Sequence, residues 1–120
     1  MLFYDIGQGF NTGVTLMNLE ALRANSLYNS YVDNTSKLAE LIAKYEFQGT
    51  LAHQDFFTLL GMEHEDLFYI LDCSWNRQLD TSGLADEKFN KIFEDFHMCP
   101  EPIKIFHANG GSIMAEDVSD

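Results

Sequence analysis

The segment Leu51–Leu60 constrains the fold of this chain more than any other part of the sequence. Apolar side chains recur there at helical spacing, so the segment predicts a helix that is anchored in a core through Phe56, Leu59 and Leu60. The polar run His53-Gln54-Asp55 falls in the first turn, where unpaired backbone N–H groups and a partial positive charge favour polar or anionic ligands. A simpler interpretation is that Asp55 or Thr50 only caps this helix.

Other segments predict further helices, short strands and loops. Helices are expected over 19–24 with Asn18 as cap, after the capping residues Asn34-Thr35-Ser36, and over 89–96, where Pro100 stops the helix. Two of them carry core-facing stripes: Leu38, Leu41, Ile42 and Tyr45 in one, and Phe89, Ile92, Phe93 and Phe96 in the other. Strands are expected over 10–18, 68–71 and 103–106. Loops are expected over 26–34, with a helical turn, over 61–66, with a solvated His64, and over 80–86, and the acidic tail 112–120 is expected to fray.

The charge balance excludes several kinds of partner. Nineteen acidic residues against seven basic ones give a net charge of −12, so the chain lacks the clustered Lys and Arg that nucleic acids and anionic membranes require. No apolar run approaches the length of about 18 residues that a membrane span needs, and Met1–Asp5 lacks the features of a signal peptide. The 120 residues fit one small domain or a piece of a larger one. Cys73 and Cys99 could be two buried thiols or one disulfide.

Polar and aromatic residues gather where the predicted strands begin or end. Asn11-Thr12-Gly13 begins the first strand, where a ligand can approach the backbone, although an ordinary turn is the simpler interpretation. Trp75-Asn76 follows the second strand, and the indole could stack on a sugar ring or pack in a core. His107 ends the third strand before Gly110-Gly111, where it could bind a metal or be an ordinary loop histidine. Asn34-Thr35-Ser36 matches the N-glycosylation pattern, but capping is the interpretation that we favour.

Four segments, taken together and in this order, resemble the family 8 retaining glycosyltransferases: Phe10–Val14 with Asn18–Glu20, His53–Phe57, Asp72–Leu79 and Ile105–Asn109. The similarity extends from Phe10 to Asp117 and is to the α-1,3-xylosyltransferases of that family in particular. It implies an α/β structure, the C-terminal part of a GT-A (nucleotide-diphospho-sugar transferase) fold, with a mixed sheet and packed helices. Residues 1–120 would then be one portion of a single glycosyltransferase domain.

The resemblance also implies a role for each matching residue. Gln54 would be catalytic, with its amide beside the anomeric carbon. The donor and acceptor sugars would contact Asn11, Thr12, Gly13, Leu51, His53, Gln54, Asp55, Trp75, Asn76 and Asn109. His107 would complete a Mn²⁺ site, and all four segments would converge on one crevice. Two residues depart from the family pattern, because His53 replaces an Asp and Ala108 replaces a Gly, so the donor contacts are expected to differ.

The implied reaction is transfer of xylose from UDP-xylose to xylose-glucose O-glycans on EGF-like repeats, with retained configuration. The leaving phosphate would take the acceptor proton on the front face, while Gln54 supports an oxocarbenium-like centre. Such enzymes hold Mn²⁺, or another divalent cation, with an Asp-x-Asp pair that this chain lacks, and one imidazole supplies too few ligands. We therefore expect the uridine-binding half to lie upstream and this chain to be inactive alone. The family also implies the lumen of the endoplasmic reticulum, a membrane anchor outside this chain, and a Cys73–Cys99 disulfide.

Two other functions compete with this interpretation. A non-catalytic acidic interaction domain, or a degenerate transferase relative, would account for His53 and Ala108. A metal-dependent hydrolase could use His53, Asp55, His64 and His107, but their spacing matches no ligand motif that supports it.

Overall fold

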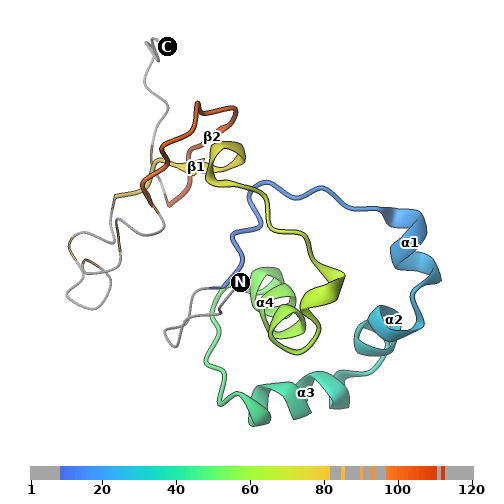
Figure 1. The fold of residues 1–120 in the computed structure, drawn as a ribbon. Helices are drawn as coiled ribbons and strands as arrows, with labels where there is room; N and C mark the ends of the chain where they lie inside the picture. Colours follow the sequence, from blue (N-terminus) through green and yellow to red (C-terminus); the bar gives the residue numbers. More distant parts are fainter. Residues whose placement is uncertain are drawn as a thin grey trace. The chain divides into compact units, whose positions relative to one another are not determined.

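The computed structural model describes residues 9–81, 85, 90, 93, 97–110 and 112. The chain divides into two compact units, Met1–Tyr69 and Ile70–Asp120, called here the N-unit and the C-unit. The N-unit contains the helices α1 (Leu19–Ala24), α2 (Ser26–Val32), α3 (Thr35–Lys44) and α4 (His53–Glu63) and the 3-10 turn η1 (Glu65–Leu67) (Figure 1). The C-unit contains the 3-10 turn η2 (Cys73–Trp75) and the strands β1 (Arg77–Gln78) and β2 (Phe106–His107). Within the described ranges, no helix is long and apolar enough to cross a membrane.

Asparagine side chains begin the first three helices of the N-unit. The Oδ1 atoms of Asn18, Asn25 and Asn34 accept first-turn backbone N–H groups at 3.0, 2.8 and 3.0 Å in α1, α2 and α3. Each such cap stabilises a helix by about 1 kcal/mol. The helix predicted over 19–24, its Asn18 cap and the helix after Asn34 are confirmed. Residues 26–34, predicted as a loop with one helical turn, are mostly helical, because the Asn25 cap begins α2 there.

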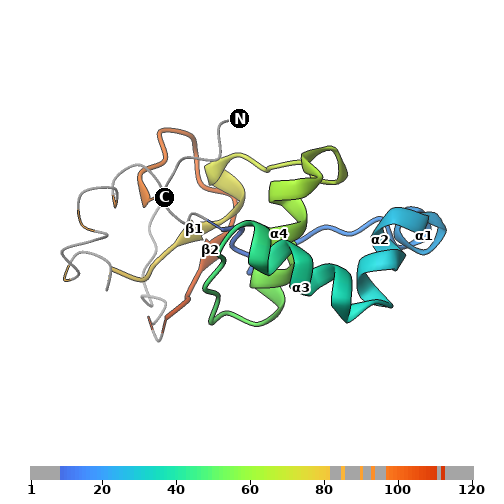
Figure 2. The ribbon, with the colours of Figure 1, turned by 90° about the horizontal axis from the view of Figure 1, so that it is seen from below.

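The core of the N-unit forms where α3 packs against α4 (Figure 2). Leu41 of α3 and Leu59 and Leu60 of α4 are buried, as their helical spacing predicts. Burial of each leucine contributes about 1.5–3 kcal/mol. The stripe on α3 is only partly covered, since Ile42 keeps 42% of its surface exposed.

The strands predicted over 10–18 and 68–71 are both wrong. Phe10 and Phe68 instead pack against each other, with ring centroids 4.9 Å apart. Gly61 of α4 makes room for the Phe10 ring, which a Cβ at that position would meet. Aromatic packing thus anchors the two segments without strand pairing. Several of their other apolar side chains face solvent, with Leu16 91% and Tyr69 88% exposed.

The acidic loop predicted over 61–66 begins as helix, because α4 continues to Glu63. The Glu63 carboxylate accepts hydrogen bonds from Lys44 Nζ at 2.6 Å and from the Tyr45 hydroxyl at 2.7 Å. These two donors hold the pKa of Glu63 below its usual value. His64 is half-buried rather than solvated, and its Nε2 lies 3.0 Å from the Tyr31 hydroxyl.

A two-stranded parallel sheet and a disulfide organise the C-unit. β1 pairs with β2 in the register Arg77↔Phe106 and Gln78↔His107, so the strand predicted over 103–106 is shorter and ends one residue later. The sheet in the described part of the chain is parallel rather than mixed, and the α/β character is correspondingly partial. The Cys73–Cys99 disulfide that the resemblance implies is present. Its closed loop, with a sequence separation of 26, contributes roughly 3 kcal/mol.

Some predictions fall mostly outside the described residues. These are the loop over 80–86, the helix over 89–96 and the tail 112–120. Phe93, a predicted core position, is helical and only 6% exposed, and its ring stacks on His97 at 4.3 Å between centroids. The backbone has left the helix by Pro100, as predicted.

Candidate functional site

The N-unit brings the segment Asn11-Thr12-Gly13 onto the first turn of α4. Thr12 N–H donates to Gln54 Oε1 at 2.9 Å, across 42 residues of sequence. Thr12 Oγ1 lies 2.8 Å from His53 Nε2. Asn11 Oδ1 accepts the Gly13 N–H at 2.9 Å, which shapes the turn. Two of the four predicted polar segments therefore lie in direct contact.

These contacts fix the direction of the Gln54 amide. The bonded atom is the carbonyl oxygen, because the Thr12 backbone N–H can only donate. That oxygen keeps a second lone pair, while Gln54 Nε2 has no partner among the described residues. The side chain is half-buried, so its amide dipole has one held orientation. A held dipole can stabilise charge without reorganising during a reaction.

The resemblance places His53 where the family pattern has a carboxylate. Its ring is exposed and shares one hydrogen bond with the Thr12 hydroxyl. An imidazole nitrogen can donate or accept in such a pair, whereas a carboxylate can only accept. The departure from the family pattern thus still allows a polar contact between α4 and the Asn11–Gly13 turn.

The start of α4 has an unusual backbone. Ala52, the N-cap residue, has a φ of 53°, and no side chain caps the helix. Asp55 Oδ2 instead reaches back to accept the Leu51 backbone N–H at 2.6 Å. The interpretation in which Asp55 or Thr50 caps α4 is therefore wrong, because Asp55 accepts the N–H of the residue before the N-cap and not one of the first helical turn. A left-handed alanine costs on the order of 1–3 kcal/mol, and such strain is common at ligand sites.

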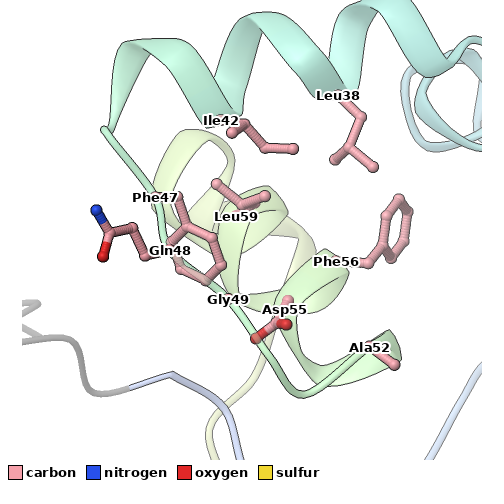
Figure 3. A pocket seen from close by; sticks show the side chains of 9 residues that line it. All are labelled: Leu38, Ile42, Phe47, Gln48, Gly49, Ala52, Asp55, Phe56 and Leu59. Carbon is pink, nitrogen blue, oxygen red and sulfur yellow. The ribbon is translucent and has the colours of Figure 1, made fainter.

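A hollow of about 280 Å³ lies between α3, α4 and the segment that joins them (Figure 3). Leu38 and Ile42 of α3 face Phe56 and Leu59 of α4 across it, and the Asp55 carboxylate lies at one edge. Its walls are otherwise mostly apolar, and Asp55 is already bonded to Leu51. The hollow therefore offers few groups that could orient a sugar, and it explains why the α3 stripe is only partly covered.

In the C-unit, Asn76 orients the predicted metal ligand His107. Asn76 directly precedes β1, and His107 is the last residue of β2. Asn76 Oδ1 lies 3.0 Å from His107 Nδ1. An amide oxygen can only accept, so Nδ1 carries the proton and Nε2 carries the lone pair of the neutral ring. Histidines that bind metals are commonly held in this way by a second residue. His107 is at a strand end, as the sequence predicts.

The Asn109 side chain is largely engaged within the C-unit. Its Oδ1 accepts the backbone N–H groups of Leu79 and Asp80, each at 3.2 Å. Its Nδ2 donates to Gln78 Oε1 at 2.9 Å. These bonds fix the end of β1. One amide hydrogen of Asn109 remains, so the residue is still a candidate for binding a sugar.

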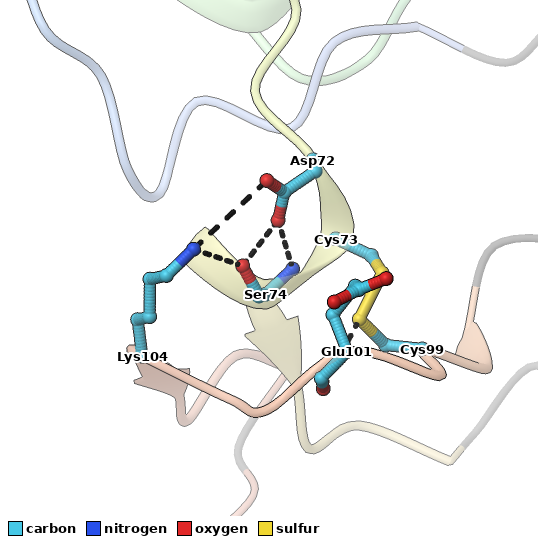
Figure 4. Close-up of a disulfide and its surroundings, with 6 residues drawn as sticks. All are labelled: Asp72, Cys73, Ser74, Cys99, Glu101 and Lys104. Carbon is cyan, nitrogen blue, oxygen red and sulfur yellow. Dashed lines mark hydrogen bonds and ion pairs between the residues drawn. A yellow bond between two sulfur atoms is a disulfide. The ribbon is translucent and has the colours of Figure 1, made fainter.

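Trp75, the remaining predicted aromatic contact, rests on Lys104 (Figure 4 shows Lys104 with Asp72 and Ser74). Lys104 Nζ lies 4.7 Å from the centre of the indole and donates to Ser74 Oγ at 3.0 Å. Ser74 is fully buried, and its hydroxyl also bonds to Asp72. The Ser74 hydroxyl and backbone N–H, with Lys104 nearby, hold the pKa of Asp72 below its usual value. Trp75 itself stays 39% exposed, so it is not a core residue.

The sequence did not predict that Lys104 and Asp72 hold the surroundings of Trp75. Lys104 sits between Ile103 and Ile105, and such alternation predicts only that its side chain is on the other face. Asp72 has a readable signal, because an aspartate side chain commonly accepts the backbone N–H two residues further on, as Asp72 does from Ser74.

Among the described residues, the predicted metal site consists of a single ligand, His107. His107 presents Nε2, while the described part of the chain contains no group of three His, Cys, Asp or Glu side chains that could hold a metal. The hydrolase alternative, which needs His53, Asp55, His64 and His107 together, therefore has no support in the described residues. The predicted contacts divide between the two units: those up to Asp55 belong to the N-unit and those from Trp75 to the C-unit. Their convergence on one crevice stays a prediction.

Comparisons with known proteins give the class. No family model matches the chain. The chain is 46% identical to xyloside xylosyltransferase 1 of Mus musculus over 109 residues, which is 91% of this chain and 27% of the relative. It is 31% identical to xylosyl- and glucuronyltransferase LARGE2 of Homo sapiens, over 87% of this chain and 13% of that protein. The crystal structure of mouse xyloside xylosyltransferase 1 in its apo form matches with a TM-score of 0.80 at 44% identity, over 89% of this chain and 36% of that one.

The chain thus belongs to the family 8 glycosyltransferases, the class that the four motifs and the fold define together. Within that family, most of this chain is homologous to xyloside xylosyltransferase 1. The identity to the Homo sapiens protein of that name is 45%. The chain spans about a quarter of the length of these relatives, 27% in both cases.

Proposed function

We propose that this chain is part of a retaining xylosyltransferase, which transfers xylose from UDP-xylose to xylose-glucose O-glycans on EGF-like repeats. The observation that carries the proposal is the 46% identity to xyloside xylosyltransferase 1 over 91% of the chain. In this proposal residues 1–120 belong to one glycosyltransferase domain, whose uridine-binding part lies outside this chain. The enzyme works in the lumen of the endoplasmic reticulum, where a membrane anchor holds it.

Gln54 is the proposed catalytic residue. As the bond to the leaving diphosphate breaks on the front face, positive charge builds at the anomeric carbon and the ring oxygen. The Gln54 carbonyl, held by Thr12 N–H at 2.9 Å, keeps a lone pair for that charge. The leaving phosphate takes the proton of the acceptor hydroxyl. Thr12 is therefore a positioning residue as well as a proposed sugar contact.

The proposed sugar contacts differ in what they can still offer. Trp75 presents the indole face opposite Lys104, a flat surface on which a sugar ring can stack. Asn109 offers its remaining amide hydrogen, and the exposed Leu51 offers an apolar surface. Polar groups for sugar hydroxyls would come from Asn11, Thr12, Gly13, His53, Asp55 and Asn76.

His107 is the proposed protein ligand that this chain supplies to Mn²⁺. Its Nε2 carries the lone pair, because Asn76 holds the proton on Nδ1. Mn²⁺, when bound, would offset the negative charge that develops on the leaving diphosphate. The other ligands would come from an Asp-x-Asp pair upstream.

The test compares Gln54→Ala with Gln48→Ala in the complete coding sequence. Gln48 is an exposed glutamine of the same unit, so it is a matched control. Xylose transfer and UDP binding are measured for each. Gln54→Ala should lower kcat by about 100-fold or more, as loss of one preorganised transition-state dipole does, and leave the Kd for UDP within about threefold. Equal losses in kcat and UDP binding would contradict the role of Gln54.

A second candidate function is a degenerate relative, or an acidic domain retained for protein contacts. The observation that favours it is His53, which stands at a family carboxylate position and is bonded to Thr12. UDP-dependent binding of Mn²⁺ by the complete protein separates the two. Such binding supports the transferase, and its absence supports the degenerate relative.

A further inference from the structure

Asn34-Thr35-Ser36 is a sequence feature that the transferase proposal does not use. It is the one position in the sequence where Ser or Thr follows two residues after an asparagine without an intervening proline. We propose that Asn34 is an N-glycosylation site. The donor would be an oligosaccharide linked to a polyprenyl diphosphate. The Asn34 Nδ2 atom loses one proton to solvent and bonds to the anomeric carbon of the first sugar, while the bond from that carbon to the diphosphate breaks and the lipid diphosphate leaves with the bonding electrons.

The surroundings of Asn34 leave room for a glycan. The side chain lies between the end of α2 and the start of α3, and each residue from Val32 to Ser36 is exposed. Val32 keeps 53% of its surface exposed although it is apolar. The first sugar residues of a glycan could shield this valine from water.

Capping of α3 and glycosylation of Asn34 use different atoms of the side chain, so they do not exclude each other. Asn34 Oδ1 accepts the Ser36 backbone N–H at 3.0 Å. Asn34 Nδ2 has no partner among the described residues. The glycosidic bond replaces one hydrogen on Nδ2 and leaves the carbonyl oxygen an amide acceptor. Asn34 can therefore cap α3 and carry a glycan at the same time.

The chain contains matched asparagines for comparison. Asn18 and Asn25 cap α1 and α2 through the same Oδ1 atom, at 3.0 and 2.8 Å. Glu20 and Leu27 occupy the positions where the sequence pattern needs Ser or Thr. The inference rests on the proposed function only for the compartment, and the Cys73–Cys99 disulfide independently indicates an oxidising one.

The experiment expresses the chain behind a heterologous signal peptide in mammalian cells. The intact mass of secreted, disulfide-bonded protein is measured before and after peptide-N-glycosidase F. We expect a single N-glycan, whose removal converts Asn34 to Asp. Ser36→Ala should abolish the glycan while retaining the cap, since the cap uses the backbone N–H of residue 36. Asn25→Gln should leave the glycan in place.

Secreted, disulfide-bonded chain without a glycan would overturn the proposal. So would a glycan that persists in the Ser36→Ala variant. Neither result bears on xylose transfer, which is measured separately. A thermal scan tests whether Asn34 still caps α3 when it carries the glycan. The glycosylated chain and the unglycosylated Ser36→Ala variant should have Tm values within about 2 °C of each other. Loss of a cap worth about 1 kcal/mol would instead lower the Tm of the glycosylated chain by several degrees.

Discussion

Replacement of Asn109 by alanine should lower the free energy of unfolding of the C-unit by an amount that follows from the hydrogen bonds of Asn109. The substitution removes two hydrogen bonds from Leu79 and Asp80 and one to Gln78. At about 1 kcal/mol each, the loss would be about 3 kcal/mol. Asn109 is only half-buried, and the Leu79 N–H keeps the His107 carbonyl as a second acceptor at 3.1 Å, so we expect a loss of about 2 kcal/mol. Asn109→Asp keeps the acceptor for both N–H groups and should cost about 1 kcal/mol or less.

Urea denaturation can assign this loss to the C-unit. Trp75 is the one tryptophan of the chain, so its fluorescence reports on that unit, while circular dichroism at 222 nm follows the N-unit helices. With a slope of about 1–3 kcal/mol per molar urea, Asn109→Ala should lower the fluorescence midpoint by about 1 M. A midpoint within about 0.2 M of wild type, or an Asn109→Asp variant as unstable as the alanine variant, would refute the reasoning.

Three further perturbations have expected results. Leu60→Ala empties a fully buried position, so circular dichroism should show a loss of about 2–5 kcal/mol, and a change below 1 would contradict the core assignment. Lys104→Met removes the cation from the indole face and should cost the C-unit about 1 kcal/mol and alter Trp75 emission; Lys37→Met, which removes a cation over a tyrosine ring of the N-unit, should not. Folding depresses the pKa of Asp72 below 3.8, so the stability that its ionised form provides is present above that pH and is lost as pH falls through the folded pKa. Asp72→Asn should flatten the acid dependence of C-unit stability, and an unchanged dependence would exclude this carboxylate as its source.

Local features of the fold could be predicted where one residue type has one dominant use. Asn18 and Asn34 begin helices because a short side-chain oxygen reaches first-turn N–H groups. Leu59 and Leu60 are buried because helical spacing places them on one face. The strands over 10–18 and 68–71 failed because a short apolar run can pair as a strand or insert aromatic rings, and Phe10 packs against Phe68 instead.

The candidate site could be predicted only in part. The sequence supplied the residue types and the resemblance supplied their roles, but neither predicts that Thr12 N–H holds the oxygen of Gln54. Such a bond depends on the path of the chain between two residues that are 42 positions apart, which local pattern does not encode. The same holds for Lys104 beneath Trp75, since cation–π contacts have no sequence spacing.

Binding of Mn²⁺ in the presence of UDP by the complete protein tests the central claim most directly. The claim is that this chain supplies His107 as a ligand to the metal of a xylosyltransferase. Isothermal titration calorimetry compares wild type with His107→Ala and with the control His64→Ala, whose imidazole pairs with Tyr31. The account predicts that His107→Ala weakens Mn²⁺ binding by at least about 10-fold and that His64→Ala does not. Equal Mn²⁺ affinity in all three proteins would contradict it.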